Sequence, residues 1–155
     1  MKFTAKEDLE APIEKVFAQV SDFETLERAA LRRGAEVQRT DSLLKKGPGM
    51  RWHATFMARG RQRQLNIEMT TFSPPNNMRF HSVAQGLETV LVIDLVALSP
   101  ARTRLSIDLN LKPNSIPARL LVQSLKLART NLTRKFNQRM ADYARDLEER
   151  IRRAG

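Results

Sequence analysis

The pattern of apolar and polar positions predicts one strand at the N-terminal end, followed by two short helices. Residues 2–9 alternate between apolar and polar side chains, which is typical of a strand with one buried face. Pro12 suits the first turn of a helix, because the N–H that it lacks would have no partner there. Asp22 suits the N-cap of a second helix, and Gly34 is a natural residue to end it.

The middle of the chain predicts a run of strands that are separated by turns. The expected strands are residues 35–41, 50–58, 62–72, 78–84, 88–98 and 102–112. Successive strands joined by short turns must be antiparallel. If the turn at residues 99–101 sets the pairing, Leu95 faces Leu105 and Ile93 faces Ile107 on the inner side of the sheet.

One long helix is expected from Ile116 to Arg153. Its apolar side chains recur at spacings of three, four and seven, so they fall on one arc. They are Leu121, Leu125, Leu132, Phe136, Met140, Tyr143, Leu147 and Ile151. The predicted fold class is α+β, a curved antiparallel sheet of about six or seven strands wrapped around this C-terminal helix.

The segment Leu9-Glu10-Ala11-Pro12-Ile13-Glu14-Lys15-Val16-Phe17 resembles the opening of the START-like proteins. These are also called SRPBCC, birch-pollen-allergen-like or helix-grip proteins. Val20-Ser21-Asp22-Phe23-Glu24 continues the resemblance, and the element order extends it over the whole chain. The resemblance implies a single helix-grip domain over residues 1–155, with a deep cavity between the sheet and the C-terminal helix.

The resemblance does not imply one function, because similar proteins include lipid and quinone carriers, polyketide cyclases, hormone receptors and chaperone co-factors. Residues 24–30 lack the aromatic motif that the quinone-binding branch usually carries. The only tryptophan is Trp52, so the Gly-Trp motif of the Hsp90-activator branch is absent as well. Both of these branches are therefore disfavoured.

The composition argues against metal chemistry and nucleophilic catalysis. Among the 155 residues there is no cysteine and there are two histidines, which leaves few ligands or bases for such sites. We therefore expect no metal, no cofactor and no catalytic residue. No apolar stretch of about 18 residues could span a bilayer. The N-terminal residues also lack the apolar core of a signal peptide, so the expected location is cytoplasmic.

The net charge of +10 is concentrated near the C-terminal end. Residues 112–155 carry 11 basic and 4 acidic side chains, and no acid lies between Leu109 and Ala141. A basic hairpin at residues 59–63 adds to this charge. The excess could bind RNA or an anionic membrane, but a solvated face is the favoured interpretation.

Arg129 is the first candidate for a site residue, because its spacing from Leu125 and Phe136 places it on the apolar face of the long helix. A guanidinium inside the cavity would need an anionic partner. The alternative is that Arg129 extends past the sheet edge to water. Glu7 interrupts the apolar face of the first strand. It is expected to pair with Arg129, to act as a pocket acid, or to lie at the cavity mouth.

Aromatic and apolar side chains on the inner faces are the other candidates for ligand binding, with ordinary core packing as the alternative. They are Trp52, Phe56, Met69, Phe80, Leu125 and Phe136. His53 and His81 fall on the opposite faces of their strands and are expected outside. Val90, Val92 and Val96 are also expected outside, where an apolar strip could contact a partner or a second copy, or be covered by polar neighbours. A monomer and a homodimer both stay open.

The favoured function is a binding or carrier protein for a small hydrophobic molecule that could be anionic. One alternative is a cyclase or dehydratase that uses the same cavity. The other is a basic adaptor for RNA, the ribosome or an anionic membrane. Binding is favoured over catalysis because only Glu7 and Arg129 are expected to point inward as a charged pair.

Overall fold

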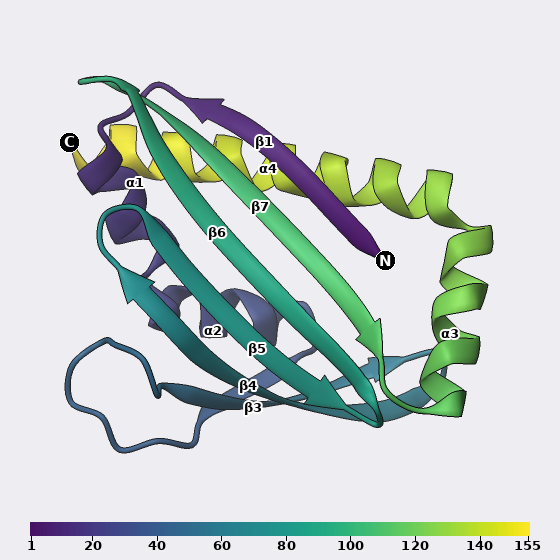
Figure 1. Cartoon of the computed structure of the whole chain (residues 1–155). Helices are drawn as coiled ribbons and strands as arrows, with labels where there is room; N and C mark the ends of the chain where they lie inside the picture. Colours follow the sequence, from purple (N-terminus) through teal and green to yellow (C-terminus); the bar gives the residue numbers. More distant parts are fainter.

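One antiparallel sheet is the central element of the computed structural model, which describes residues 1–155 (Figure 1). The sheet has seven strands in the order β1-β7-β6-β5-β4-β3-β2. The strands are β1 (Lys2–Leu9), β2 (Glu36–Arg39), β3 (Arg51–Ala58), β4 (Arg61–Ser73), β5 (Asn77–Ala84), β6 (Leu87–Ser99) and β7 (Arg102–Pro113). This arrangement confirms the expected curved sheet of a helix-grip fold.

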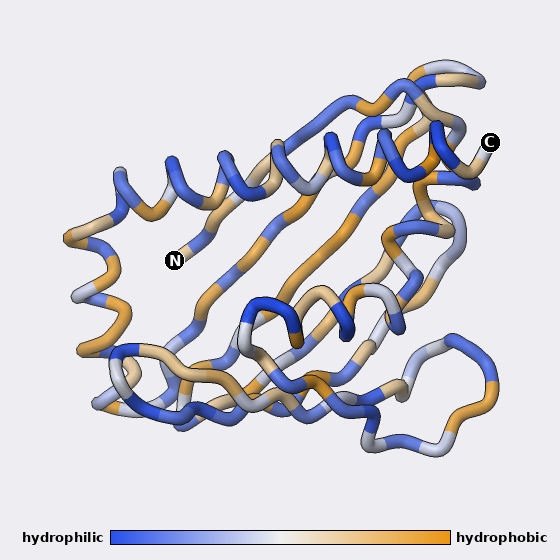
Figure 2. The backbone as a smooth tube through the Cα atoms, turned by 180° about the vertical axis from the view of Figure 1, so that it is seen from behind, coloured by the Kyte–Doolittle hydropathy of each residue, from blue (hydrophilic) through white to orange (hydrophobic).

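Four helices complete the chain: α1 (Ile13–Val20), α2 (Phe23–Arg32), α3 (Ile116–Leu127) and α4 (Arg129–Ala154). Figure 2 shows α4 and α2 in front of the same, concave face of the sheet. Asp22 caps α2 by accepting a hydrogen bond from the backbone N–H of Thr25 at 3.3 Å. No helix is both long enough and apolar enough to cross a membrane.

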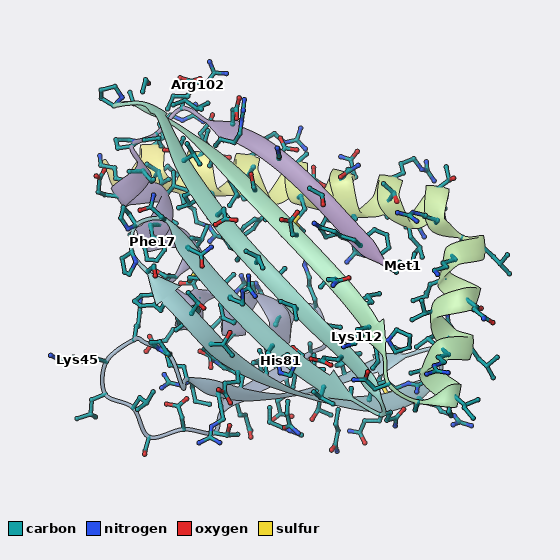
Figure 3. The ribbon with its side chains drawn as sticks, in the orientation of Figure 1. Met1, Phe17, Lys45, His81, Arg102 and Lys112 are labelled. Carbon is teal, nitrogen blue, oxygen red and sulfur yellow. The ribbon has the colours of Figure 1, made fainter.

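The strand register follows the alternation of the sequence. Ile93 lies opposite Ile107 and Leu95 opposite Leu105 across β6 and β7, as the turn between them predicts. The same parity places His81 on the convex side, which faces the viewer in Figure 3. There the His81 ring contacts the Glu88 carboxylate at 2.6 Å. The inner side of the sheet is therefore the apolar one, and the histidines lie away from it.

The prediction of one helix from Ile116 to Arg153 is wrong. The chain leaves helical geometry at Ala128 (φ −102°, ψ 18°), which follows α3, and α4 then continues at a sharp angle to α3 (Figure 1). α3 buries Ala118 and Val122 and contacts β7, whereas α4 packs against β1 and α1. A straight helix could not serve both surfaces, so tertiary packing breaks it without a proline or glycine.

The core lies where α1 and the C-terminal half of α4 meet the sheet. Leu9, Val16 and Leu147 are fully buried there, together with Leu95 and Leu105 of the sheet. The first half of α4 contributes only partly buried side chains to this core. The concave face is therefore tightly filled at one end and less filled at the other.

Candidate ligand-binding cavity

A cavity of about 510 Å³ lies on the concave face of the sheet, between α2 and α4. Of its 18 lining residues, 15 have mainly apolar side chains, among them Tyr143, whose ring is apolar and whose hydroxyl is polar. They come from α1 and α2 (Val20, Phe23, Leu26, Glu27), from β2 to β5 (Val37, Trp52, Leu65, Ile67, Phe80, Ser82), from β6 and β7 (Thr89, Leu91, Ile93, Ile107, Leu109) and from α4 (Phe136, Met140, Tyr143). A volume and a lining of this kind are typical of sites for small apolar molecules.

Three aromatic rings form one wall of the cavity. The Phe23 ring lies 5.2 Å from the Trp52 ring and 6.1 Å from the Phe80 ring, measured between centroids. The Trp52 and Phe80 rings are 6.0 Å apart. Edge-to-face and tilted contacts at these distances are favourable, so the wall is a rigid apolar surface.

Three hydroxyl groups are the neutral polar groups of the cavity. Ser82 of β5 lies directly opposite Thr89 of β6, and Tyr143 belongs to α4. None of the three hydroxyls forms a hydrogen bond with the protein. Every fully buried side-chain oxygen or nitrogen has a partner, so these three hydroxyl oxygens are not fully buried. The three oxygens are therefore open to the cavity, and burial raises the pKa of Tyr143 to about 12. At neutral pH the phenol is protonated and can donate a hydrogen bond.

Glu27 of α2 is the one charged residue of the lining. Desolvation by burial raises the pKa of its carboxyl group, and nearby Glu24 raises it further, while Arg39 and Arg28 oppose the shift. Glu27 forms no ion pair within 4 Å, so neither arginine fully offsets the desolvation. A carboxyl group that lines an apolar cavity can accept a proton from a ligand or donate one to it.

The structure brings together only part of the predicted lining. Trp52, Phe80 and Phe136 line the cavity. Met69 has no exposed surface and belongs to the core. Phe56 and Leu125 line a separate groove of about 450 Å³ between α3 and the β3–β4 hairpin. The break at Ala128 explains this division, because it moves Leu125 off the helix that carries Phe136.

Of the two placements that the sequence leaves open for Arg129, inside the cavity or out in water, the structure shows the second. Arg129 is the first residue of α4 and is exposed, because the helix break rotates it out of the apolar arc. Glu7 points to the inner side of β1 and is half-buried, but it is not part of the lining and forms no ion pair with Arg129. The cavity therefore contains no arginine or lysine.

Glu27 and the hydroxyls are the residues that the sequence prediction missed. Glu27 follows Phe23 by four positions, a spacing that places both side chains on one helical face. Ser82 has the same parity as Phe80, and Thr89 the same parity as Leu91 and Ile93. These signals are present in the sequence, but a lone polar residue on an apolar face is easily read as a break in the pattern.

The fold and the cavity are those of the helix-grip class of proteins, and a comparison with family models identifies the family within that class. The model of the polyketide cyclase/dehydrase and lipid transport family matches residues 1–148. The chain belongs to that family. A search of curated protein sequences finds no significant match.

Solved structures with similar folds confirm the architecture. The Zhui aromatase/cyclase from Streptomyces has 13% identity and a TM-score of 0.69, with 100% of this chain and 98% of that chain covered. The protein TTHA0849 from Thermus thermophilus has 18% identity and a TM-score of 0.69, with 100% and 99% covered. An HSP90 activator from Plasmodium falciparum has 21% identity and a TM-score of 0.51, with 74% and 76% covered. Identities this low show the fold alone.

Proposed function

We propose that this protein binds a small, neutral, hydrophobic molecule in the cavity between the sheet, α2 and α4. The observation that carries the proposal is the lining, in which 15 of 18 residues are apolar around about 510 Å³. Burial of apolar ligand surface against such walls would supply most of the binding free energy. The family to which the chain belongs, which includes lipid transport in its description, supports this class of ligand.

The charges around the cavity favour a neutral ligand over an anionic one. No lysine, arginine or histidine is in the lining, and the one carboxyl group there belongs to Glu27. An anionic ligand would meet that carboxylate with no cation in the lining itself to offset the repulsion and the desolvation, because the nearby Arg39 is already paired with Asp41. Hydroxyl and carbonyl groups of a neutral ligand can instead bond to Ser82, Thr89, Tyr143 and Glu27.

A titration with the neutral dye Nile red tests this proposal, because its emission rises in apolar surroundings. We expect saturable binding to the wild type, and quenching of Trp52, the only tryptophan, which is 5% exposed and in the lining. Leu91→Trp should fill the cavity and abolish saturable binding. Val96→Trp, on the outer face of the same strand, is the matched control and should bind normally. Equal binding by both variants would place the dye elsewhere.

A second candidate function is a cyclase or dehydratase, and Glu27 is the observation that favours it. Its raised pKa suits a group that removes a proton from a carbon next to a carbonyl group and returns it. The bicyclic ketone α-tetralone in D₂O is a neutral probe of that step. If Glu27 is a general base, the wild type exchanges the α-protons for deuterons and Glu27→Gln does not. Glu14→Gln, which removes an exposed carboxylate of α1 outside the lining, should keep the exchange rate. No exchange by the wild type would leave binding as the function.

A further inference from the structure

The outer face of α3 carries an exposed apolar stripe. Ile116, Leu120 and Leu127 follow one another at spacings of four and seven, which places them on one side of the helix. Their exposed fractions are 72%, 61% and 91%. The opposite side of α3 is the one that packs on the body, where Ala118 and Val122 are buried. A helix that is apolar on its solvent side as well as its buried side indicates a contact surface.

The charged side chains of α3 are both basic. Arg119 and Lys126 lie seven residues apart and border the stripe on one flank. Glu88 lies near the start of the helix, but its carboxylate is already bonded to His81 and Asn114. No acidic residue occurs from Leu109 to Ala141, a stretch that holds Lys112, Arg119, Lys126, Arg129, Arg134, Lys135 and Arg139. Arg59 and Arg63 of the β3–β4 hairpin line the groove beside α3 and add to the positive field. The partner of this surface must therefore be apolar and anionic at once.

A second copy of the chain fits this surface poorly. A two-fold interface brings a patch against itself, so the basic residues around α3 would repel one another. RNA fits poorly too, because phosphates do not cover leucines, and α3 has no aromatic residue on which a base could stack. An anionic bilayer offers phosphates at its surface and acyl chains just below them, within reach of an inserted leucine side chain.

We infer that α3 docks this protein on anionic membranes. The helix lies in the plane of the interface, with Ile116, Leu120 and Leu127 inserted among the acyl chains, and with the surrounding arginines and lysines at the lipid phosphates. α3 stands at one end of the sheet and its outer face is free of other elements (Figure 1). This inference concerns a different surface from the cavity and does not depend on what the cavity binds.

Cosedimentation with vesicles tests the inference. The wild type should bind vesicles of phosphatidylcholine mixed with phosphatidylglycerol, bind pure phosphatidylcholine much more weakly, and lose affinity as salt is added. Leu120→Glu with Leu127→Glu should weaken binding by at least about tenfold, because two buried apolar side chains are lost. Arg119→Gln with Lys126→Gln should weaken it by roughly fivefold or more.

Leu44→Glu is the matched control. Leu44 is fully exposed, but it lies in the loop between β2 and β3, beside the labelled Lys45 and at the other end of the molecule from α3 (Figures 1 and 3). This variant should bind the vesicles as the wild type does. All substituted residues are exposed, and circular dichroism verifies that each variant is folded.

Three results would overturn the inference. The first is equal binding to both kinds of vesicle, which would exclude the role of charge. The second is equal loss in the Leu44 variant and the α3 variants, which would exclude α3 as the docking element. The third is the absence of vesicle binding. A dimer in lipid-free solution that the α3 double variant abolishes would then assign the surface to a second copy of the chain, and binding to RNA would assign it to RNA.

Discussion

Glu27 of α2 and Tyr143 of α4 face the same apolar cavity from two different helices. Burial raises the pKa of both groups, that of Tyr143 to about 12. Burial favours the neutral form of each group, so the two side chains offer hydrogen bonds to a ligand without placing two full charges in the cavity. This pair makes the cavity suitable for an apolar ligand that carries hydroxyl or carbonyl groups.

The Glu27 carboxyl group should make stability depend on pH in a recognisable way. Its folded-state pKa is raised, so the folded protein holds a proton that the unfolded chain releases near pH 4 or above. Stability is therefore lost as the pH rises through the range between the unfolded and folded pKa values. Glu27→Gln should match the wild type in Tm at acidic pH and exceed it at neutral pH. A difference that stays constant across a pH series of thermal melts would contradict this.

Asp41 should stabilise the loop that follows β2. Only 3% of its side chain is exposed, and its carboxylate accepts hydrogen bonds from the Arg39 guanidinium at 2.8 Å, from the Arg51 N–H at 2.7 Å and from the Leu43 N–H at 2.9 Å. These donors hold the pKa of the carboxyl group well below its usual range. Asp41→Asn should therefore lower the free energy of unfolding by about 3 kcal/mol at neutral pH, or Tm by roughly 6 to 12 °C.

The control for Asp41 is Asp142→Asn, which removes an exposed carboxylate that pairs with Arg145 one helical turn away. Exposed pairs of this kind contribute little, so its Tm should change by about 1 to 2 °C at most. A lowered pKa stabilises the fold above the ordinary carboxyl range and loses that effect as the pH falls. The Asp41→Asn penalty should therefore shrink below about pH 4. A penalty of the same size at pH 3 and pH 7 would contradict the assigned hydrogen bonds.

Gly86 should hold the start of α3 against the β5–β6 turn. Its backbone has a positive φ of 80°, and an added Cβ would lie 2.6 Å from Cβ of Ser115, the N-cap of α3. Gly86→Ala should cost at least about 2 kcal/mol, from the backbone conformation and the close approach together. Gly34→Ala has a similar φ of 90° and open space around it, so it should cost only about 1 kcal/mol. Equal urea midpoints for the two variants would show that the contact with Ser115 is unimportant.

The sequence predicts the sheet well because alternation is a local property of each strand. The pairs Ile93–Ile107 and Leu95–Leu105 follow directly from the turn between β6 and β7, and the outward side of His81 follows from its neighbour Phe80. Strand pairing preserves this parity over the whole sheet. Which side chains face the cavity side of the sheet was therefore predictable.

The end of the chain was harder to predict because its helix breaks for tertiary reasons. The apolar spacing from Leu121 to Ile151 has one seven-residue step, from Leu125 to Leu132, in which Arg129 takes an apolar position, and no proline or glycine marks a stop at Ala128. The chain turns at Ala128 because α3 and α4 pack on different surfaces of the protein. The single predicted arc also placed Leu125 in the same cavity as Phe136, since a helical arc is a valid guide only within one straight helix.

Native mass spectrometry of the protein purified from its own host would show whether the cavity holds a neutral ligand. We expect a bound neutral, hydrophobic molecule on the wild type and on Val96→Trp, and none on Leu91→Trp, whose side chain would fill the cavity. Fragmentation of the complex would identify the class of the ligand. Retention of the same molecule by Leu91→Trp, or a bound anion as the only ligand of the cavity, would show that the cavity is not a site for a neutral hydrophobic molecule.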